Sequence, residues 1–276
     1  MQKGGIIISI SNNKGGVGKT SVTCNLAVAL SRLKKRVLVV DMDHQCNASE
    51  ILRMEGVPPT NTIYELLDPD SGHAGNVSEF VYPSRQSNVD CISNIEESSA
   101  LDIPLAKASP QSFTILRDKI RRFCLKSYDY TLIDNPPSIG LWLTLSLYAS
   151  DFALVPVDAG SGNSLDGLRR VLEMINDIRT AGNSDLKFLR LLVNRVHMRL
   201  SVSRQIVKYL QERLPADQLF DTNVPSNTAI QKAEFMKQTV FEYEPTSRAA
   251  SAYRQLAKEL VTITNGANTL EPADKE

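Results

Sequence analysis

The chain has 276 residues, of which 42% are hydrophobic and 22% charged, and its 31 Lys and Arg residues are matched by 31 Asp and Glu residues. This is the composition of an ordinary globular protein that can bury a full core. The balanced charge excludes a protein-wide attraction to nucleic acid or membrane, so any anion-binding surface must be local. No apolar run approaches the roughly 18 residues of a spanning helix, and the strand-like segment starts by about residue 5, so we expect neither a spanning helix nor a signal peptide. Four cysteines without C-x-x-C spacing indicate a reducing compartment, so we expect a cytoplasmic protein.

Apolar strand-like runs alternate with longer amphipathic stretches along the chain. This alternation predicts an α/β fold with a mostly parallel, twisted sheet that is covered by helices on both faces. Strands are expected at 5–11, 36–43, near 88–92, 128–137, 151–159 and 186–194. Helices are expected at about 18–33, 47–54, 62–67, 112–126, 139–149, 164–181, 201–213 and 245–262. We expect one domain over 1–263, with 44–111 inserted on the same sheet, and a polar flexible tail over 264–276.

The segment "SNNKGGVGKTS", residues 11–21, follows the first strand and ends in the Gly-Lys-Thr of a phosphate-binding loop. Its glycines allow backbone N–H groups to converge on one point at the positive end of the following helix. Lys19 adds a charge for the β- and γ-phosphates, and the Thr20 hydroxyl is placed to bind Mg²⁺. The sequence therefore predicts a nucleotide site, although Asn13 replaces the first glycine of the usual pattern.

Acidic residues end two further strands, where ligands of parallel sheets bind. Asp134 follows "TLI" and fits the acid that supports a phosphate-bound Mg²⁺. Asp41 and Asp43 lie on the same side of their strand because side chains alternate. We expect Asp41 to support the metal and Asp43 to orient the attacking water; the alternative is that one of them only caps the segment from Gln45 onward.

Lys14 is a second cation in a loop that already holds Lys19. Two ammonium groups close together repel each other, and the cost is smaller if Lys14 points outward to a phosphate held by another molecule. Nucleotide would then join two copies of the chain face to face. A solvated surface lysine is the alternative.

The segments "KGGVGKT", "VLVVDMDHQCNAS" and "YDYTLIDNPPSIG" resemble the nucleotide motifs of the ParA/MinD family of deviant-Walker P-loop ATPases, and the resemblance continues to about residue 262. It implies a P-loop NTPase fold and an ATP-sandwiched homodimer with Lys14 reaching the partner's nucleotide. It also implies slow, partner-stimulated ATP hydrolysis to ADP and phosphate that needs Lys14, Lys19 and Asp43, with Mg²⁺ held by Thr20, Asp41 and Asp134. The implied ATP-binding residues are Lys14, Gly15, Gly16, Val17, Gly18, Lys19, Thr20, Ser21, Asn194 and Pro225.

Two types of this family differ in the surface they bind. The MinD type binds membrane through a C-terminal amphipathic helix, whereas the ParA type binds DNA without sequence specificity as an ATP dimer. Here the last predicted helix has a single apolar stripe, typical of core packing, and the following "NGANTLEPADKE" lacks the basic and apolar residues of a membrane-surface helix. We therefore expect a ParA-type protein, associated with the nucleoid and not with membrane.

A basic strip over 187–213 contains seven Lys and Arg residues and one acid, Glu212. Such a strip can neutralise DNA phosphates without reading bases, although a solvated helix face is the alternative. Where many partition ATPases carry arginines, this chain has Ser226 and Ala229. The DNA surface is expected within about 187–250, and the predicted DNA contacts are Arg195, Arg199, Arg204, Lys208, Lys232 and Lys237.

The leading hypothesis is an ATP-driven positioning switch: the ATP dimer grips nucleoid DNA until a cargo-bound, ParB-like partner stimulates hydrolysis. The cargo would be a chromosome, a plasmid or a protein organelle such as a carboxysome. The alternatives are a membrane-associated MinD-like ATPase and a metal-cluster carrier or reductase on the same scaffold. The last needs paired cysteines, which Cys24, Cys46, Cys91 and Cys124 do not form in sequence.

Overall fold

The computed structural model describes residues 4–54, 58–69, 71, 76–160 and 166–267. The strands are β1 (Ile6–Ile10), β2 (Val37–Asp41), β3 (Tyr82–Pro83), β4 (Val89–Ile92), β5 (Tyr130–Asp134), β6 (Phe152–Asp158) and β7 (Lys187–Asn194). They form one seven-stranded sheet with the order β3-β4-β2-β5-β1-β6-β7. The β3–β4 pair is antiparallel and the other pairs are parallel, which confirms the predicted mostly parallel sheet.

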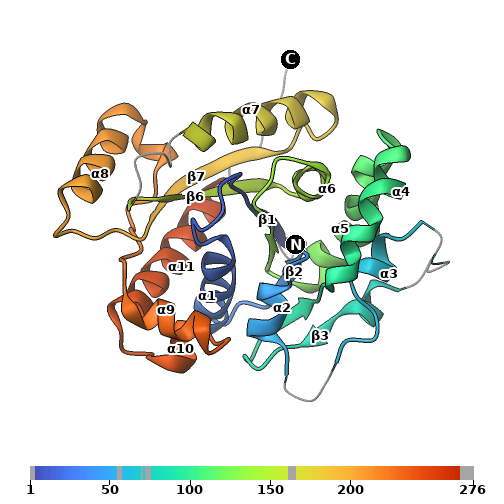
Figure 1. Ribbon diagram of the computed structural model, residues 1–276, viewed down its shortest axis with the longest axis horizontal. Coiled ribbons are helices and arrows are strands. Elements are labelled where there is room, and N and C mark those ends of the chain that lie inside the picture. Colours follow the sequence, from blue (N-terminus) through green and yellow to red (C-terminus); the bar gives the residue numbers. More distant parts are fainter. Residues whose placement is uncertain (1–3, 55–57, 70, 72–75, 161–165, 268–276) are drawn as a thin grey trace.

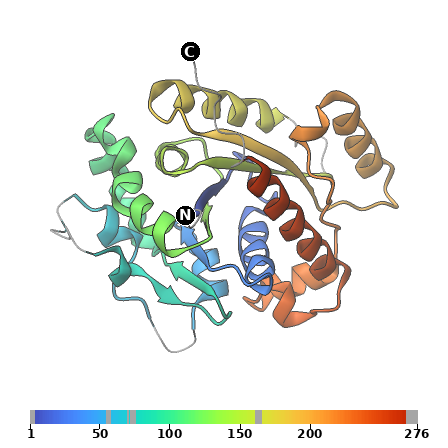
Figure 2. The ribbon, with the colours of Figure 1, turned by 180° about the vertical axis from the view of Figure 1, so that it is seen from behind.

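Helices cover both faces of this sheet, as its nearly continuous apolar strands predict. In β1, Ile6, Ile8 and Ile10 pack into the cluster under one helical layer, whereas Ile7 packs into the cluster on the opposite face. Figures 1 and 2 show α1 and α11 side by side on one face and α6 and α7 on the other. The first layer contains α1 (Lys19–Arg32), α2 (Asn47–Leu52), α9 (Thr228–Phe235), α10 (Val240–Tyr243) and α11 (Arg248–Ala267).

The opposite layer divides into two neighbouring groups, one against β2, β5 and β1 and the other against β6 and β7. The first group contains α3 (Ile63–Leu67), α4 (Asp102–Lys107), α5 (Ile115–Ser127) and α6 (Leu141–Ala149). The second contains α7 (Asp166–Ala181) and α8 (Ser201–Arg213), of which α8 lies at the periphery of the molecule (Figures 1 and 2). Short 3₁₀ turns lie at Val77–Phe80, Glu96–Leu101, Gln111–Thr114 and Ala216–Gln218.

Three features differ from the sequence expectation. The inserted region carries the two-residue strand β3 and the helix α4, and the C-terminal half carries α9 and α10, none of which was predicted. The last helix also continues to Ala267, beyond the expected start of a flexible tail at residue 264. Thr264 is fully buried, and its hydroxyl lies 2.7 Å from Tyr130 Oη, because the buried stripe of α11 reaches one turn past Leu260. Residues 268–276 lie outside the described part of the chain.

Candidate functional site

The carboxyl ends of the strands bring together polar residues that are far apart in sequence. In the parallel register, Asp134 lies opposite both Ile10 and Asp41, and Asp158 lies opposite Asn194. The loop that follows β1 therefore lies beside the acids that end β2 and β5. This arrangement is the one that the sequence pattern predicts.

The loop between β1 and α1 depends on glycine at two positions. Gly16 has φ +75° and Gly18 has φ +87°, a region that side chains with a Cβ rarely occupy. A Cβ on Gly18 would also lie 2.4 Å from Asn194 Nδ2. The start of the loop is held by Asn12, whose Oδ1 accepts from the Lys14 N–H at 3.0 Å and whose Nδ2 donates to the Pro156 carbonyl at 2.7 Å.

Lys19, the first residue of α1, is a buried cation with a side chain directed into the loop. It is 7% exposed, and its Nζ donates to the Lys14 carbonyl at 3.2 Å. Burial lowers the pKa of Lys19, whereas the carboxylates of Asp134 and Asp43 oppose that shift. A charge already removed from water in this way interacts strongly with a phosphate that enters the loop.

Asp134 and Asp41 are fully buried carboxylates at neighbouring strand ends. Burial raises the pKa of both, and for Asp41 the charge of Asp134 raises it further. Asp134 accepts hydrogen bonds from Thr20 Oγ1 at 2.7 Å and Thr23 Oγ1 at 2.9 Å. Asp41 Oδ2 accepts from the backbone N–H and the hydroxyl of Ser49, at 2.8 and 2.7 Å. The hydrogen bonds partly offset the cost of burying these charges.

This donor set fits Mg²⁺ that arrives with a nucleotide. Asp41 and Asp134 are buried carboxylates that repel each other, so a divalent cation beside them is favourable. The Thr20 hydroxyl, which donates to Asp134, lies between Asp134 and the cleft. Within the described residues there is no group of three or more His, Cys, Asp or Glu side chains that could hold a metal alone. Phosphate oxygens and water would complete the ligand set, as is usual for Mg²⁺. Asp41 would act on the metal through its negative charge and not as a direct ligand, because its oxygens already accept hydrogen bonds from Ser49 and the Asp43 N–H.

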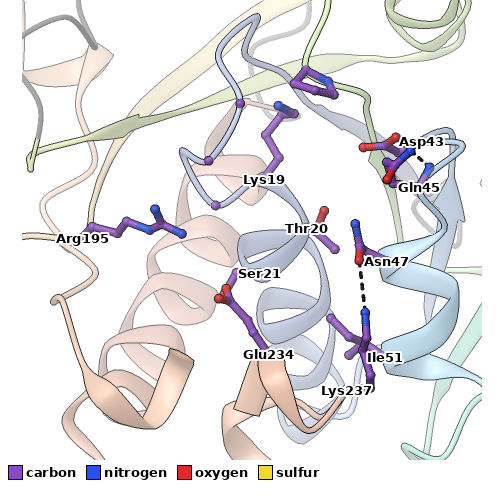
Figure 3. Close-up of a pocket in the computed structure, with 14 residues that line it drawn as sticks. Lys19, Thr20, Ser21, Asp43, Gln45, Asn47, Ile51, Arg195, Glu234 and Lys237 are labelled. Atoms are coloured by element: carbon purple, nitrogen blue, oxygen red, sulfur yellow. Dashed lines mark hydrogen bonds between the residues drawn. The ribbon is translucent and has the colours of Figure 1, made fainter. Parts of the chain in front are cut away.

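A cleft of about 350 Å³ opens over these groups (Figure 3). Asp43, which is 7% exposed and accepts from the Gln45 N–H at 3.0 Å, lies on one side of it. The lining of the cleft includes residues that the sequence assigned to nucleotide binding or catalysis, namely Gly15, Gly16, Gly18, Lys19, Thr20, Ser21 and Asp43. It also includes Gln45, Asn47, Ile51, Pro137 and Glu234, which sequence reasoning missed.

Two predicted DNA contacts line this cleft as well, namely Arg195 and Lys237. Lys237 is tied to α2, because its Nζ lies 2.6 Å from Glu50 Oε2 and 3.3 Å from Asn47 Oδ1. It also has a positive φ of 51° at the end of α9. Both side chains are therefore placed to act on a ligand of the cleft.

Asn194 and Pro225, which the resemblance assigns to ATP binding, lie at different places. Asn194 is 3% exposed, donates from Nδ2 to the Val17 carbonyl at 2.8 Å and accepts from the Arg195 N–H at 2.9 Å. It thus holds the buried Val17 in place from behind the loop. Pro225 lines a separate hollow of about 610 Å³, where it pairs with Val196 through a β-bridge.

Lys14, the second lysine of the phosphate loop, is half-buried.

The remaining predicted DNA contacts, Arg199, Arg204, Lys208 and Lys232, are exposed. Arg204 donates to the Met198 carbonyl at 3.1 Å, and Lys208 lies 3.6 Å from Glu212. Ala229, one of the two positions where the family resemblance led us to look for an arginine, is 1% exposed and packs in the core under α1. A DNA contact from that position is therefore absent in this chain.

The four cysteines are free thiols, and none of them lines the cleft. Cys24, Cys91 and Cys124 are buried, and Cys46 is half-buried. Burial raises the pKa of each thiol, to about 12 for Cys46 and Cys124, which disfavours the thiolate that a metal cluster needs. In the described ranges, no helix has the length and apolarity to cross a bilayer.

Comparisons with known proteins identify the family of the chain. A family model described as an AAA domain matches residues 5–188. The chain is 30% identical to the sporulation initiation inhibitor protein Soj of Bacillus subtilis, over 93% of this chain and 98% of that protein. It is 33% identical to the chromosome-partitioning ATPase Soj of Thermus thermophilus, over 92% and 94% of the two chains. It therefore belongs to the ParA/MinD family of P-loop ATPases, in its Soj-like branch.

Solved structures with the same fold bind nucleotide. The cobyrinic acid a,c-diamide synthase of Mycobacterium smegmatis, with a bound ATP analogue and magnesium, superposes with a TM-score of 0.80 at 22% identity, over 95% and 96% of the two chains. The cell division ATPase MinD of Pyrococcus furiosus superposes with a TM-score of 0.72 at 25% identity, over 94% and 99%. The present chain is an ATPase of this family.

Proposed function

We propose that this partitioning or positioning ATPase binds ATP and Mg²⁺ in the cleft over α1, dimerises around the nucleotide and then binds DNA without sequence specificity. The observation that carries the proposal is the loop with buried Lys19 beside the Thr20–Asp134 hydrogen bond. In the nucleotide complex, Lys19 and the backbone N–H groups of Gly15, Gly16 and Gly18 hold phosphate oxygens. The Thr20 hydroxyl and Asp134 would hold Mg²⁺, which would supply positive charge to the phosphate oxygens.

Hydrolysis needs a group that directs water at the γ-phosphate. Asp43 is suited to this role because it lines the cleft near Lys19, while one of its oxygens is fixed by the Gln45 N–H. ATP is thereby cleaved to ADP and phosphate. Lys14 would reach the nucleotide of the partner copy, so ATP binding and dimerisation become a single event.

The DNA surface would lie on α8 and the segment before it, with Lys232 on α9 contributing. Arg199, Arg204 and Lys208 are exposed at the periphery of the molecule, where they can neutralise phosphates without entering a groove. A cargo-bound partner of the ParB type would stimulate hydrolysis and so release the DNA. The chromosome-partitioning relatives favour a chromosome or another DNA cargo, and such a protein would act in the cytoplasm on the nucleoid.

The test is binding of a random-sequence duplex with no nucleotide, ADP–Mg²⁺ or ATP–Mg²⁺, at low and moderate salt. The wild type is expected to bind only with ATP and to lose affinity as salt rises. Asp43→Ala should keep binding, because it forms the dimer without hydrolysing ATP, and Lys14→Ala should lose it.

The basic surface has a matched control on the neighbouring helix. Replacing Arg199, Arg204 and Lys208 by Ala should weaken DNA binding at least about tenfold and reduce the dependence on salt. The same loss of three charges on α7, at Arg169, Arg170 and Arg179, should have little effect. Equal losses from the two triple variants would contradict the assignment of the surface. Absence of DNA binding with ATP, together with ATP-dependent binding to anionic vesicles, would favour the MinD-like alternative.

A further inference from the structure

The turn after β2 holds Asp43 outside the sheet. The strand ends at Asp41 and the next helix, α2, begins at Asn47, so Asp43 lies on a short connection. One of its carboxylate oxygens accepts from the Gln45 N–H at 3.0 Å (Figure 3), and its carbonyl accepts from the Cys46 N–H at 2.8 Å. The direction of the Asp43 side chain is therefore set by the conformation of this turn.

The same turn has a costly backbone conformation. Cys46 has φ +53° although it carries a Cβ, and a residue stays in this region only where surrounding contacts hold it there. The two hydrogen bonds to Asp43 join residues only two or three positions apart, so they do not fix the turn relative to the rest of the site. His44, in the middle of the turn, supplies a contact with a different element.

His44 packs against Trp142 of α6. The two ring centroids lie 5.5 Å apart and the ring planes meet at 79°, the edge-on arrangement that aromatic rings favour. The His44 side chain is half-buried, and among the described residues its Nδ1 atom has no hydrogen-bond partner. Because no hydrogen bond at this atom competes with the contact, packing on Trp142 decides where the imidazole ring lies.

Trp142 is a rigid support for that ring. It is 4% exposed and packs in the apolar cluster that α5 and α6 form against the sheet. Its Nε1 donates to Asp102 Oδ1 at 2.5 Å, which fixes the rotation of the indole relative to α4. The helix α6 begins at Leu141, shortly after β5 ends at Asp134. The contact therefore joins the segments after β2 and β5, which both carry acids of the site.

We propose that His44, held by Trp142, is a positioning residue for Asp43, so that ATP hydrolysis depends on the His44–Trp142 contact and nucleotide binding does not. The inference rests on the proposed role of Asp43 in directing water at the γ-phosphate. Neither aromatic side chain is among the residues that line the cleft. Without the contact the turn can move, and a carboxylate displaced by about 1 Å no longer directs the water efficiently.

The experiment measures three properties of the full chain in Mg²⁺: single-turnover ATP hydrolysis, ADP affinity by calorimetry and ATP-dependent dimerisation by light scattering. His44→Ala should slow hydrolysis at least about tenfold, while ADP affinity stays within about twofold of wild type and the dimer still forms. His44→Phe keeps an aromatic ring against Trp142 and should recover most of the rate. The proposal is overturned if His44→Ala hydrolyses ATP at the wild-type rate, if it loses ADP affinity or the dimer, or if His44→Phe is equally slow.

Phe123→Ala is the matched control. Phe123 makes a comparable edge contact with Tyr128, at 6.0 Å and 64°, and neither residue lines the cleft, so this variant should change neither the rate nor ADP affinity. Trp142 is the only tryptophan in the sequence, so its fluorescence tests the contact directly. The emission should differ between wild type and His44→Ala and should be the same in wild type and Phe123→Ala. Identical emission in all three proteins would show that the contact is absent in solution and would overturn the proposal.

Asp43→Ala separates this inference from the proposed function. If Asp43→Ala hydrolyses ATP as fast as wild type, Asp43 does not direct the water, and its proposed role and the present inference both fail. If Asp43→Ala is slow, adding His44→Ala should slow hydrolysis no further, because His44 acts only through Asp43. A further loss of about tenfold in the double variant would leave the role of Asp43 intact and overturn only the positioning role of His44.

Discussion

The nucleotide cleft and the basic face of α8 are both polar, but they are built in different ways. In the cleft, Asp41 and Asp134 are fully buried and each is held by hydrogen bonds from neighbouring elements. On α8, Lys208 is 75% exposed and forms an ion pair with Glu212 on its own helix. Substitutions in the cleft should therefore change both folding and function, whereas substitutions on α8 should change function alone. The free energy of unfolding should therefore fall on substitution around the cleft and stay nearly unchanged on substitution of α8.

The largest effect is expected at Gly18. Gly18→Ala combines a left-handed backbone with a Cβ 2.4 Å from Asn194 Nδ2, so the bond from Asn194 to the Val17 carbonyl must break. We expect a loss of about 3 kcal/mol in the free energy of unfolding, and loss of nucleotide binding. Urea denaturation and ADP titration measure the two effects.

Gly16→Ala is the matched control. Gly16 also has a positive φ, of 75°, but nothing lies within 4 Å of its Cβ position. Only the backbone cost of about 1 kcal/mol is expected. Similar losses for the two variants would show that the contact with Asn194 contributes nothing.

A smaller loss is expected behind the cleft, at Ser49. Its hydroxyl donates to Asp41 at 2.7 Å and accepts from the Asn94 N–H at 2.9 Å. Ser49→Ala leaves a buried carboxylate and a buried N–H short of a partner, so about 2 kcal/mol of unfolding free energy should be lost. Ser99→Ala removes an exposed hydroxyl that bonds only to the Glu96 carbonyl, and should change stability by less than about 0.5 kcal/mol. A loss at Ser49 no greater than that at Ser99 would contradict this account of Asp41.

The sequence predicted the parts of the site that lie within one strand and the loop after it. Asp134 ends β5, Asp43 lies two residues after β2, and Lys19 and Thr20 begin the helix after the β1 loop, so parallel strand ends bring them together. Glu234 was missed because it belongs to α9, a short helix with a weak apolar pattern that reaches the cleft only through tertiary packing. Tertiary packing also decides the neighbours of Lys237 and Asn194, which the sequence did not indicate.

Lys237 is the clearest of these, since it was predicted as a DNA contact that substitutes for the arginines absent at Ser226 and Ala229. In the structure, the ion pair with Glu50 and the bond to Asn47 join the end of α9 to α2 across the cleft. Nothing in the sequence near Lys237 indicates that α2 is its neighbour. Asn194 was assigned to ATP binding by resemblance, and in the structure its amide group bonds to the Val17 carbonyl and to the Arg195 N–H.

Lys237 also provides a test that separates backbone from side chain. Its φ of +51° is costly for a residue with a Cβ, so Lys237→Gly relieves strain while it removes an ion pair that is 49% and 42% exposed. The two effects are each about 1 kcal/mol or less, so stability should change little. Lys237→Ala loses the pair and keeps the strain, and should be less stable than Lys237→Gly by about 1 kcal/mol in urea denaturation. Equal stability of the two variants would mean that this backbone conformation carries no cost.

The smallest change in stability is expected on α8. Replacing Arg199, Arg204 and Lys208 by Ala removes one exposed i,i+4 pair and the bond from Arg204 to the Met198 carbonyl, while alanine favours the helix. The free energy of unfolding should therefore stay within about 0.5 kcal/mol of wild type, and ADP titration should give an unchanged affinity. If DNA binding is lost under these conditions, the loss reports the removed charges and not a damaged fold. If the same variant also loses stability or ADP affinity, α8 is coupled to the cleft and the contrast between the two regions does not hold.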